Sequence, residues 1–432
     1  MRNKKWGALA IGFLTLLGLS NEAQAMPMFG KQTGLDCTAC HLQHMPKLNA
    51  VGRSFAASGM TQGKKNVDVN NSGMDLYASV MVKAMYEETW DKPTSDGKIK
   101  DYVTPTAGGE WSVPRTASLY VGGRVSENVG AIIDLSYKDV EDNSIQGKVV
   151  YAKEIENGYM GAVGYSSASF GPFSGMETYN TGLYKPLRTF DIKKLSNAFQ
   201  ASEIGTGSST GMQVYLDRDM GAGHLFATAG LFAPAQDNAD MKVSDNILPF
   251  ARVAYEYPVS DFNFILGGFG IVGGSKVSVS EPLSIDRRTY GIDFQLEGIV
   301  AEKSVSLILS KVLKNEVTYT GIGSNLLEPE RYTNLDNTAF SVEGEVNLFH
   351  DFGVKAAYLT FDDRSDYSVQ NTGYAKNHIN VKDIDHAYTV GVDYSFKVYL
   401  PMKVAVEHSW ATPSLDTVKN YRDFLVSLNI LY

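Results

Sequence analysis

The sequence predicts an all-β transmembrane barrel of about 16 antiparallel strands, preceded by a short N-terminal segment of different character. Three observations support this fold class. Period-two alternation of apolar and polar residues begins near residue 74 and recurs to the end of the chain. The links between alternating stretches are short and long in turn. Glycine and aromatic residues are abundant (41 Gly, 24 Tyr and 20 Phe), which suits many strands with aromatic girdles.

The first 25 residues have the features of a secretory signal peptide. Basic residues stand at their start, an apolar stretch covers residues 6–19, and Ala23-Gln24-Ala25 provides a cleavage site. The apolar stretch is too short for a helix that spans a bilayer. We therefore expect cleavage after Ala25 and a chain that begins in the periplasm at residue 26.

The charge of the chain limits its partners. Residues 1–25 carry a net charge of +2, so the formal charge of −9 becomes −11 without them. Nucleic acids and anionic lipid surfaces both favour basic patches, so neither is expected as a partner.

Alternation defines the predicted strands. In residues 76–84 one parity reads Leu, Ala, Val, Val, Ala and the other reads Tyr, Ser, Met, Lys, which is the pattern of a half-buried strand. The 16 predicted strands lie near residues 74–86, 116–125, 129–138, 145–154, 158–166, 211–219, 222–232, 248–257, 261–271, 287–300, 303–313, 338–348, 351–361, 386–397, 401–410 and 421–432.

The lengths of the links favour a membrane barrel over a soluble sandwich. Links from an even strand to the next odd strand are short, whereas several links from odd to even are long: 87–115, 167–210, 314–337 and 362–385, with 139–144 as a short exception. Outer-membrane barrels have short periplasmic turns and long external loops. In a soluble β-sandwich, short and long loops are not expected to alternate along the chain. We therefore predict a barrel over residues 74–432, with loops 87–115 and 167–210 outside the cell.

The N-terminal segment, residues 26–73, contains the sequence Cys37-Thr38-Ala39-Cys40-His41. Two cysteines at this spacing, followed directly by histidine, form the attachment site of a c-type haem. The thiols of Cys37 and Cys40 would bond to the haem vinyl groups, and His41 would be the proximal iron ligand. A disulfide or a thioredoxin-like redox pair is the alternative, but it leaves His41 unexplained.

The segment is too short to enclose a haem in a core of its own. A barrel of 16 strands has a lumen wide enough for water or a plug. We therefore expect the segment, with one covalent haem c, to enter the barrel partly from the periplasmic side.

The second axial ligand of the iron is less strongly indicated. Met60 lies far enough along the chain to fold back over the iron, and methionine raises the reduction potential. His44 and Met45 follow His41 too closely to reach the opposite haem face and are expected at the haem edge. The remaining candidates are Met28, Met81, Met85 and His224.

Charged residues occur both on the inward parity and in the predicted external loops. A polar lumen is the simplest interpretation of the inward group: Lys83, Arg124, Asp134, Lys148, Arg252, Glu256, Asp293, Glu297, Glu343 and Glu345. Carboxylates in the loops could gather a cation, although solvated loop charge is the simpler explanation. These residues are Asp139, Glu141, Asp142, Asp362, Asp363, Asp366, Asp383 and Asp385.

With the haem motif followed by a barrel, the chain resembles the fused outer-membrane monohaem cytochrome c–porin family, whose best-known members are implicated in iron oxidation. The resemblance covers the whole chain after residue 25. It rests on the haem motif and barrel together with His44, Pro46, Leu48-Asn49, Gly52-Arg53 and Phe55.

The resemblance implies an outer-membrane electron conduit with Fe(II):cytochrome c oxidoreductase activity. Extracellular Fe(II), or another donor, would reduce the haem, and a periplasmic cytochrome c or similar carrier would receive the electron. Two alternatives remain: a diffusion porin whose haem-bearing segment is a gate or sensor plug, and electron transfer out of the cell.

Overall fold

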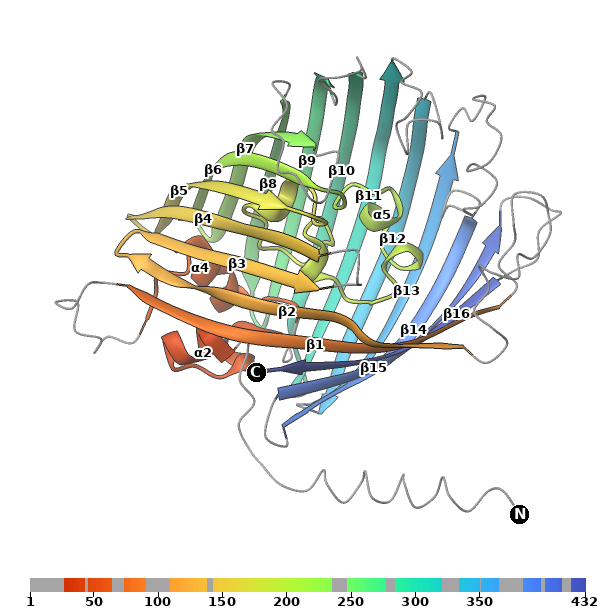
Figure 1. Cartoon of the computed structure of the whole chain (residues 1–432), viewed down its shortest axis with the longest axis horizontal. Helices are drawn as coiled ribbons and strands as arrows, with labels where there is room; N and C mark the ends of the chain where they lie inside the picture. The colour runs from red at the N-terminus through yellow and green to blue at the C-terminus, as the bar shows by residue number, and fades with distance from the viewer. Residues whose placement is uncertain are drawn as a thin grey trace.

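The computed structural model describes residues 27–42, 46–63, 74–90, 109–137, 143–234, 247–276, 284–320, 334–349, 351–364, 384–397, 401–413 and 421–432. In these residues 16 antiparallel strands form one closed barrel, in which each strand pairs with its neighbours in sequence and β1 pairs with β16 (Figure 1). The predicted fold class is therefore confirmed. The predicted signal peptide, residues 1–25, lies outside the described residues.

All 16 predicted strands are present, and most extend beyond the predicted limits. The strands are β1 Asp75–Trp90, β2 Glu110–Ser126, β3 Val129–Tyr137, β4 Asn143–Ile155, β5 Gly158–Ser167, β6 Ser209–Met220, β7 Gly223–Pro234, β8 Leu248–Val259, β9 Phe262–Lys276, β10 Ser284–Val300, β11 Lys303–Thr320, β12 Asn334–Phe349, β13 Phe352–Asp363, β14 Ile384–Lys397, β15 Pro401–Pro413 and β16 Tyr421–Leu431.

Strand β8 shows why alternation locates these strands. Phe250, Arg252 and Glu256 are buried on the inner face, whereas Val253 and Tyr255 are exposed on the outer face. Along the wall the outer face carries exposed apolar side chains, among them Met212, Val214, Leu266 and Ile292. An apolar exterior around a polar interior is the pattern of a barrel that spans a lipid bilayer.

The seam between the first and last strands uses the end of the chain. β1 and β16 pair from Met81 opposite Leu431 to Trp90 opposite Arg422. Beyond them, Val80 donates its backbone N–H to the Tyr432 carbonyl at 2.6 Å and accepts from the Tyr432 N–H at 2.8 Å. Tyr432 therefore extends the pairing of the first and last strands by one residue.

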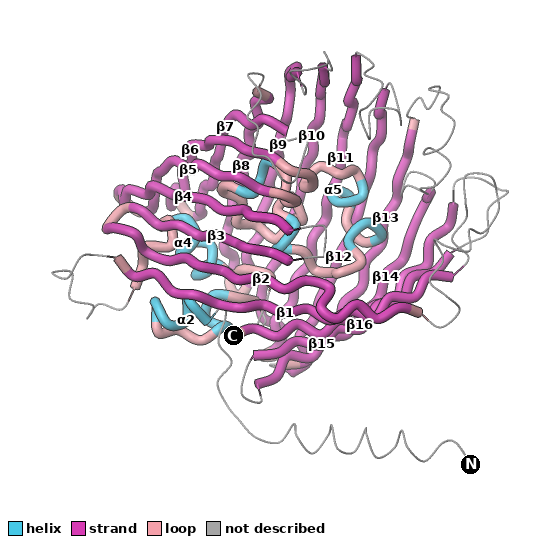
Figure 2. Tube along the Cα trace, in the orientation of Figure 1, coloured by secondary structure: helices cyan, strands magenta, loops and turns pink. Residues whose placement is uncertain are grey.

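Two segments contain the helices, most of which lie within the outline of the barrel, while the first helix lies beside β1 at its edge (Figure 2). The N-terminal segment, here the described residues 27–42 and 46–63, contains α2 Pro27–Thr33, α3 Cys37–Cys40 and α4 Ala50–Ala57. The inward loop, residues 168–208 between β5 and β6, contains η2 Pro172–Ser174, η3 Lys185–Leu187, η4 Lys193–Leu195 and α5 Ala198–Ala201. No helix of the described residues is long and apolar enough to cross a membrane.

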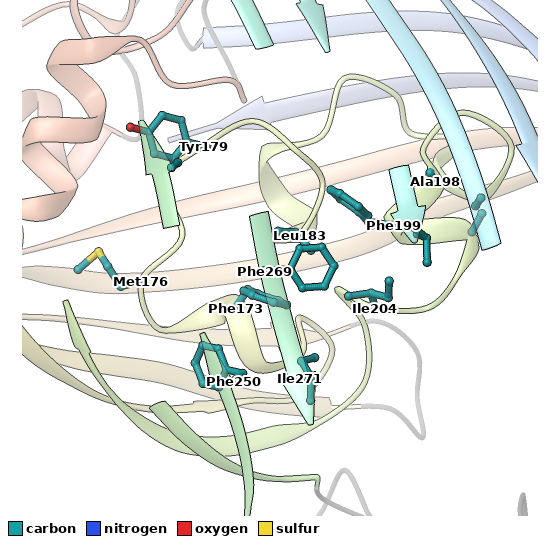
Figure 3. Packing of buried hydrophobic residues seen from close by; sticks show 14 of the residues in the cluster. Phe173, Met176, Tyr179, Leu183, Ala198, Phe199, Ile204, Phe250, Phe269 and Ile271 are labelled. Atoms are coloured by element: carbon teal, nitrogen blue, oxygen red, sulfur yellow. The ribbon is translucent and has the colours of Figure 1, made fainter. Parts of the chain in front are cut away.

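The inward loop corrects one prediction, because the sequence assigned residues 167–210 to an external loop. Instead the loop folds back into the lumen, where Phe173, Leu183 and Phe199 are fully buried (Figure 3). The ring of Phe173 lies 5.5 Å from that of Phe250 and 5.4 Å from that of Phe269, both on the barrel wall. A loop rich in large apolar side chains gains more by packing on the wall than by standing in water.

Candidate functional site

The two cysteines lie on one short helical turn. Helix α3 comprises Cys37–Cys40, and His41 follows it with its backbone N–H donated to the Cys37 carbonyl at 3.0 Å. Residues three apart on a helix lie on the same face, so Cys37 and Cys40 share one face of the turn. Cys37 and Cys40 are thiols, and burial raises the pKa of Cys40. The spacing that two thioether bonds to one haem require is therefore present.

His41 is held in one tautomer by its surroundings. Its Nδ1 lies 3.2 Å from the carbonyl oxygens of both Pro46 and Lys47. A carbonyl can only accept a hydrogen bond, so Nδ1 must carry the proton. In the neutral ring, Nε2 then holds the lone pair that would bind iron. Haem-bound and other metal-bound histidines commonly donate their second ring N–H in this way.

The Leu48-Asn49 and Gly52-Arg53 pairs brace this turn. The Asn49 side chain donates to the carbonyls of Ala39 at 3.1 Å and His41 at 3.3 Å, and its oxygen caps α4 by accepting from the Gly52 N–H. A Cβ atom on Gly52 would lie 2.1 Å from the Cys40 carbonyl oxygen. Only glycine lets α4 approach the cysteine turn this closely.

Arg53 ties the N-terminal segment to the wall at the end of the barrel with short turns. Its guanidinium donates to Glu297 at 2.8 Å and to both oxygens of Glu256 at 2.9 and 3.0 Å. Burial alone would lower the pKa of Arg53, but Glu297 and Glu256 raise it above its ordinary value. Tyr179 of the inward loop lies against the same guanidinium, 5.2 Å from the ring centroid.

Lys47 forms a second anchor close to the histidine. Its ammonium contacts Glu345 at 2.5 Å and donates to the Ser306 hydroxyl at 2.6 Å, all three side chains being buried. The predicted inward parity of Glu256, Glu297 and Glu345 is confirmed. From the sequence we expected these residues only to make the lumen polar. In the structure they pair with cations of the N-terminal segment.

The inward loop meets the N-terminal segment directly. Asn180 accepts a hydrogen bond from the Leu48 backbone N–H at 2.9 Å and donates to the Leu48 carbonyl at 2.8 Å. The same side-chain nitrogen donates to Glu297 at 2.9 Å. Asn180 is only 1% exposed, so it is not an external position. No feature of the local sequence marked it, because the contact joins residues 132 positions apart.

A buried ion cluster anchors the inward loop to the wall. Arg252 of β8 donates to Asp293 of β10 at 2.6 Å and contacts Glu177 of the loop, and all three side chains are fully buried. The Arg252 guanidinium also lies 5.9 Å from the ring centroid of Tyr179. Two arginines therefore flank Tyr179: Arg53 of the N-terminal segment and Arg252 of β8.

The structure places Met60, the predicted distal ligand, in the apolar cluster. Met60 is 5% exposed and belongs to the same cluster as Phe55, Ala57 and Val150. Its backbone carbonyl accepts from the Gln32 side chain at 2.6 Å. Packing in this cluster describes where Met60 lies, and its role as an iron ligand stays a prediction. His44 and Met45 lie outside the described residues.

The remaining candidate ligands have structural surroundings of their own. Met28 is fully buried and donates its backbone N–H to the Ser79 hydroxyl of β1 at 2.9 Å. His224 lies between two carboxylates, 3.0 Å from Asp217 and 2.8 Å from Asp219. These ion pairs explain the inward histidine without a metal.

The acidic residues predicted outside are only partly described. Asp362 lies 3.5 Å from Arg364, and Asp385 lies 3.1 Å from His386. The described part of the chain contains no group of three or more His, Cys, Asp or Glu that could hold a metal ion. The gathering of cations by these loops stays a prediction, since Asp139, Glu141, Asp142, Asp366 and Asp383 lie outside the described residues.

Comparison with known proteins finds similarity only among solved structures. No family model matches the chain, and no curated protein sequence matches it. The outer membrane channel DcaP of Acinetobacter baumannii is 14% identical, with 84% of this chain and 98% of that chain covered and a TM-score of 0.48. The loop L8 deletion mutant of OmpT from Vibrio cholerae is 13% identical, with coverage of 84% and 100% and a TM-score of 0.45. The anion-selective porin from Comamonas acidovorans is 9% identical, with coverage of 83% and 99% and a TM-score of 0.44.

Proposed function

We propose that this chain is an outer-membrane, porin-like barrel that holds one haem c at its periplasmic end. The observation that carries the proposal is the geometry of residues 37–41, where both cysteines lie on one helical turn and His41, directly after it, donates Nδ1–H to two backbone carbonyls. The apolar exterior and the predicted signal peptide favour the outer membrane.

In this proposal each residue of the site has a separate role. Cys37 and Cys40 form the covalent thioether bonds, and His41 supplies the proximal ligand. The haem, when bound, supplies one-electron exchange. Asn49 holds the cysteine turn in shape, and Arg53 holds the segment against the wall. Extracellular Fe(II) is the proposed donor and a periplasmic cytochrome c or similar carrier the acceptor, as the family resemblance implies.

The packing of two segments within the barrel supports electron exchange over free diffusion of solutes. The N-terminal segment and the inward loop meet at Leu48 and Asn180, and the apolar cluster runs from Phe55 through the loop to the wall. A packed apolar region excludes water and polar solutes. An electron needs no aqueous path, so a plugged barrel can still connect two compartments electronically.

A second candidate is a diffusion porin whose haem-bearing segment is a gate or sensor. The observation that favours it is the cationic face of the inward loop, where Lys185, Arg188 and Lys194 keep partial contact with solvent. Charged side chains with access to water beside the wall suit a narrowed aqueous path.

One set of experiments separates these candidates. Purified protein should show haem-linked peroxidase activity on a denaturing gel, and Cys37→Ala with Cys40→Ala should lose it while the barrel still forms. In liposomes, the conduit predicts that external Fe(II) reduces the haem and that sugars do not leak. Sugar flux with a haem that stays oxidised in excess Fe(II) would establish the gated porin instead. A wild-type gel without haem-linked activity would contradict both.

A further inference from the structure

The inward loop enters from the end of the barrel opposite to the N-terminal segment, yet the two are in direct contact. The contact is formed by the two hydrogen bonds between Asn180 and the backbone of Leu48, at 2.9 and 2.8 Å. A side-chain amide that pairs with both polar groups of one residue fixes that residue's position and orientation. Tyr179, the neighbour of Asn180, lies at the end of the packed loop shown in Figure 3.

Leu48 directly follows the two residues whose carbonyls hold the imidazole of His41. Pro46 and Lys47 both accept from His41 Nδ1 at 3.2 Å, and Leu48 also forms a β-bridge with His41. The chain between residues 46 and 48 is short, so a fixed Leu48 restricts where the two carbonyls can lie. Three contacts therefore hold residues 46–48. Lys47 forms an ion pair with Glu345, the Leu48 N–H donates to Asn180, and Arg53 donates to the Leu48 carbonyl at 3.2 Å.

We propose that Asn180 is a positioning residue for the proximal ligand, through which the inward loop sets the reduction potential of the haem. The inference rests on the proposed attachment of haem at Cys37, Cys40 and His41. Asn180 does not contact His41 itself; it fixes the backbone that accepts the Nδ1 proton.

The physical effect has a definite sign. A firm Nδ1–H···O=C hydrogen bond increases the electron density of the imidazole and makes it a better donor to ferric iron. Stabilising the ferric state lowers the reduction potential. If Asn180 no longer fixes Leu48, the carbonyls of Pro46 and Lys47 can move away from the ring, the ligand becomes less basic, and the potential rises.

The test is a redox titration of the purified holoprotein with Asn180→Ala. Asn197→Ala is the matched control, because Asn197 is also a buried amide of the inward loop. It donates to the Thr181 carbonyl at 2.9 Å and to Glu343 at 2.5 Å, and in the described chain its hydrogen-bond partners do not include residues 46–48. We expect a positive shift of the potential for Asn180→Ala and none for Asn197→Ala, with similar losses of thermal stability.

The outcomes are distinguishable. If the alanine variant does not insert, Asn180→Ser carries the same test, since its hydroxyl is too short to bridge both polar groups of Leu48. Unchanged potentials in the Asn180 variants, or an equal shift in Asn197→Ala, would overturn the positioning role. A wild-type protein that lacks covalent haem on a denaturing gel would instead remove the proposed function, and the inference with it.

Discussion

The N-terminal segment and the inward loop both pack on the barrel wall, but apolar packing has a larger share in holding the inward loop. The N-terminal segment is tied largely by buried ion pairs, Arg53 on Glu256 and Glu297 and Lys47 on Glu345. The inward loop adds the apolar packing of Phe173 and Phe199 against the wall to its ion pairs with Arg252 and Lys83. Ion pairs depend on geometry and on the presence of both partners, whereas apolar packing depends on area and volume. Breaking the contacts of one segment should therefore loosen that segment and leave the other packed on the wall.

The largest effect is expected at Arg53. Arg53→Ala leaves Glu256 and Glu297 buried without their cation, which costs about 3–5 kcal/mol in docking of the N-terminal segment. Limited proteolysis of the folded barrel should then cut within residues 27–63 and leave the inward loop intact. Adding Glu256→Gln and Glu297→Gln should recover part of the protection, and a lack of any recovery would count against the ion pairs as the anchor.

Removing apolar volume from the inward loop should give the converse result. Leu183 is fully buried, and Leu183→Ala should destabilise the packed loop by about 2–5 kcal/mol. Hydrogen exchange should increase in residues 168–208, while the protection of α4 should change less. Equal loosening of both segments would show that they form a single cooperative unit.

A smaller effect is expected where the N-terminal segment packs on itself. Gly52→Ala would place a Cβ atom 2.1 Å from the Cys40 carbonyl oxygen and push α4 away from the cysteine turn. Overpacking of this kind costs about 1–3 kcal/mol. The yield of covalent haem per folded barrel should fall, with Ala56→Gly in the same helix as a control for helix stability.

The last effect, a dependence of stability on pH, concerns a charge on the inward loop. Burial, together with Lys185 and Arg188, lowers the pKa of Lys193 to about 5 from the ordinary value of 10.5. Between these values the unfolded chain binds more protons than the folded one, so this residue makes stability rise with pH. Lys193→Gln should flatten the rise of stability with pH, measured by thermal unfolding from pH 5 to 10. An unchanged slope would show that other groups cause the rise.

The barrel and the cysteine turn could be predicted from sequence because both are encoded locally. Strand alternation is visible within ten residues, and Cys37 to His41 is a continuous motif. The inward loop could not be predicted in the same way. Its length indicated an external loop, and nothing in its local sequence shows that Asn180 pairs with Leu48, since the contact depends on tertiary packing.

The lumen charges illustrate the same limit. Alternation correctly placed Glu256, Glu297 and Glu345 on the inner face. Their partners, Arg53 and Lys47, lie some 200 to 300 residues earlier in the chain, so spacing could not identify them. Conversely, Gly52-Arg53 was recognised as part of a family pattern, and the structure supplies the physical reasons: close approach to Cys40 for the glycine and two carboxylates for the arginine.

The seam of the barrel imposes an order on biogenesis. Because β1 pairs with β16, the wall stays an open sheet until β16 has formed and paired. Met28 bonds to Ser79, the residue next to that seam, so the amino-terminal end of the N-terminal segment docks beside the last strand pair to form. A group bound covalently to this segment can therefore enter while the wall is still open. Pairing of β1 with β16 then encloses the group, so the closed barrel needs no opening as large as the group.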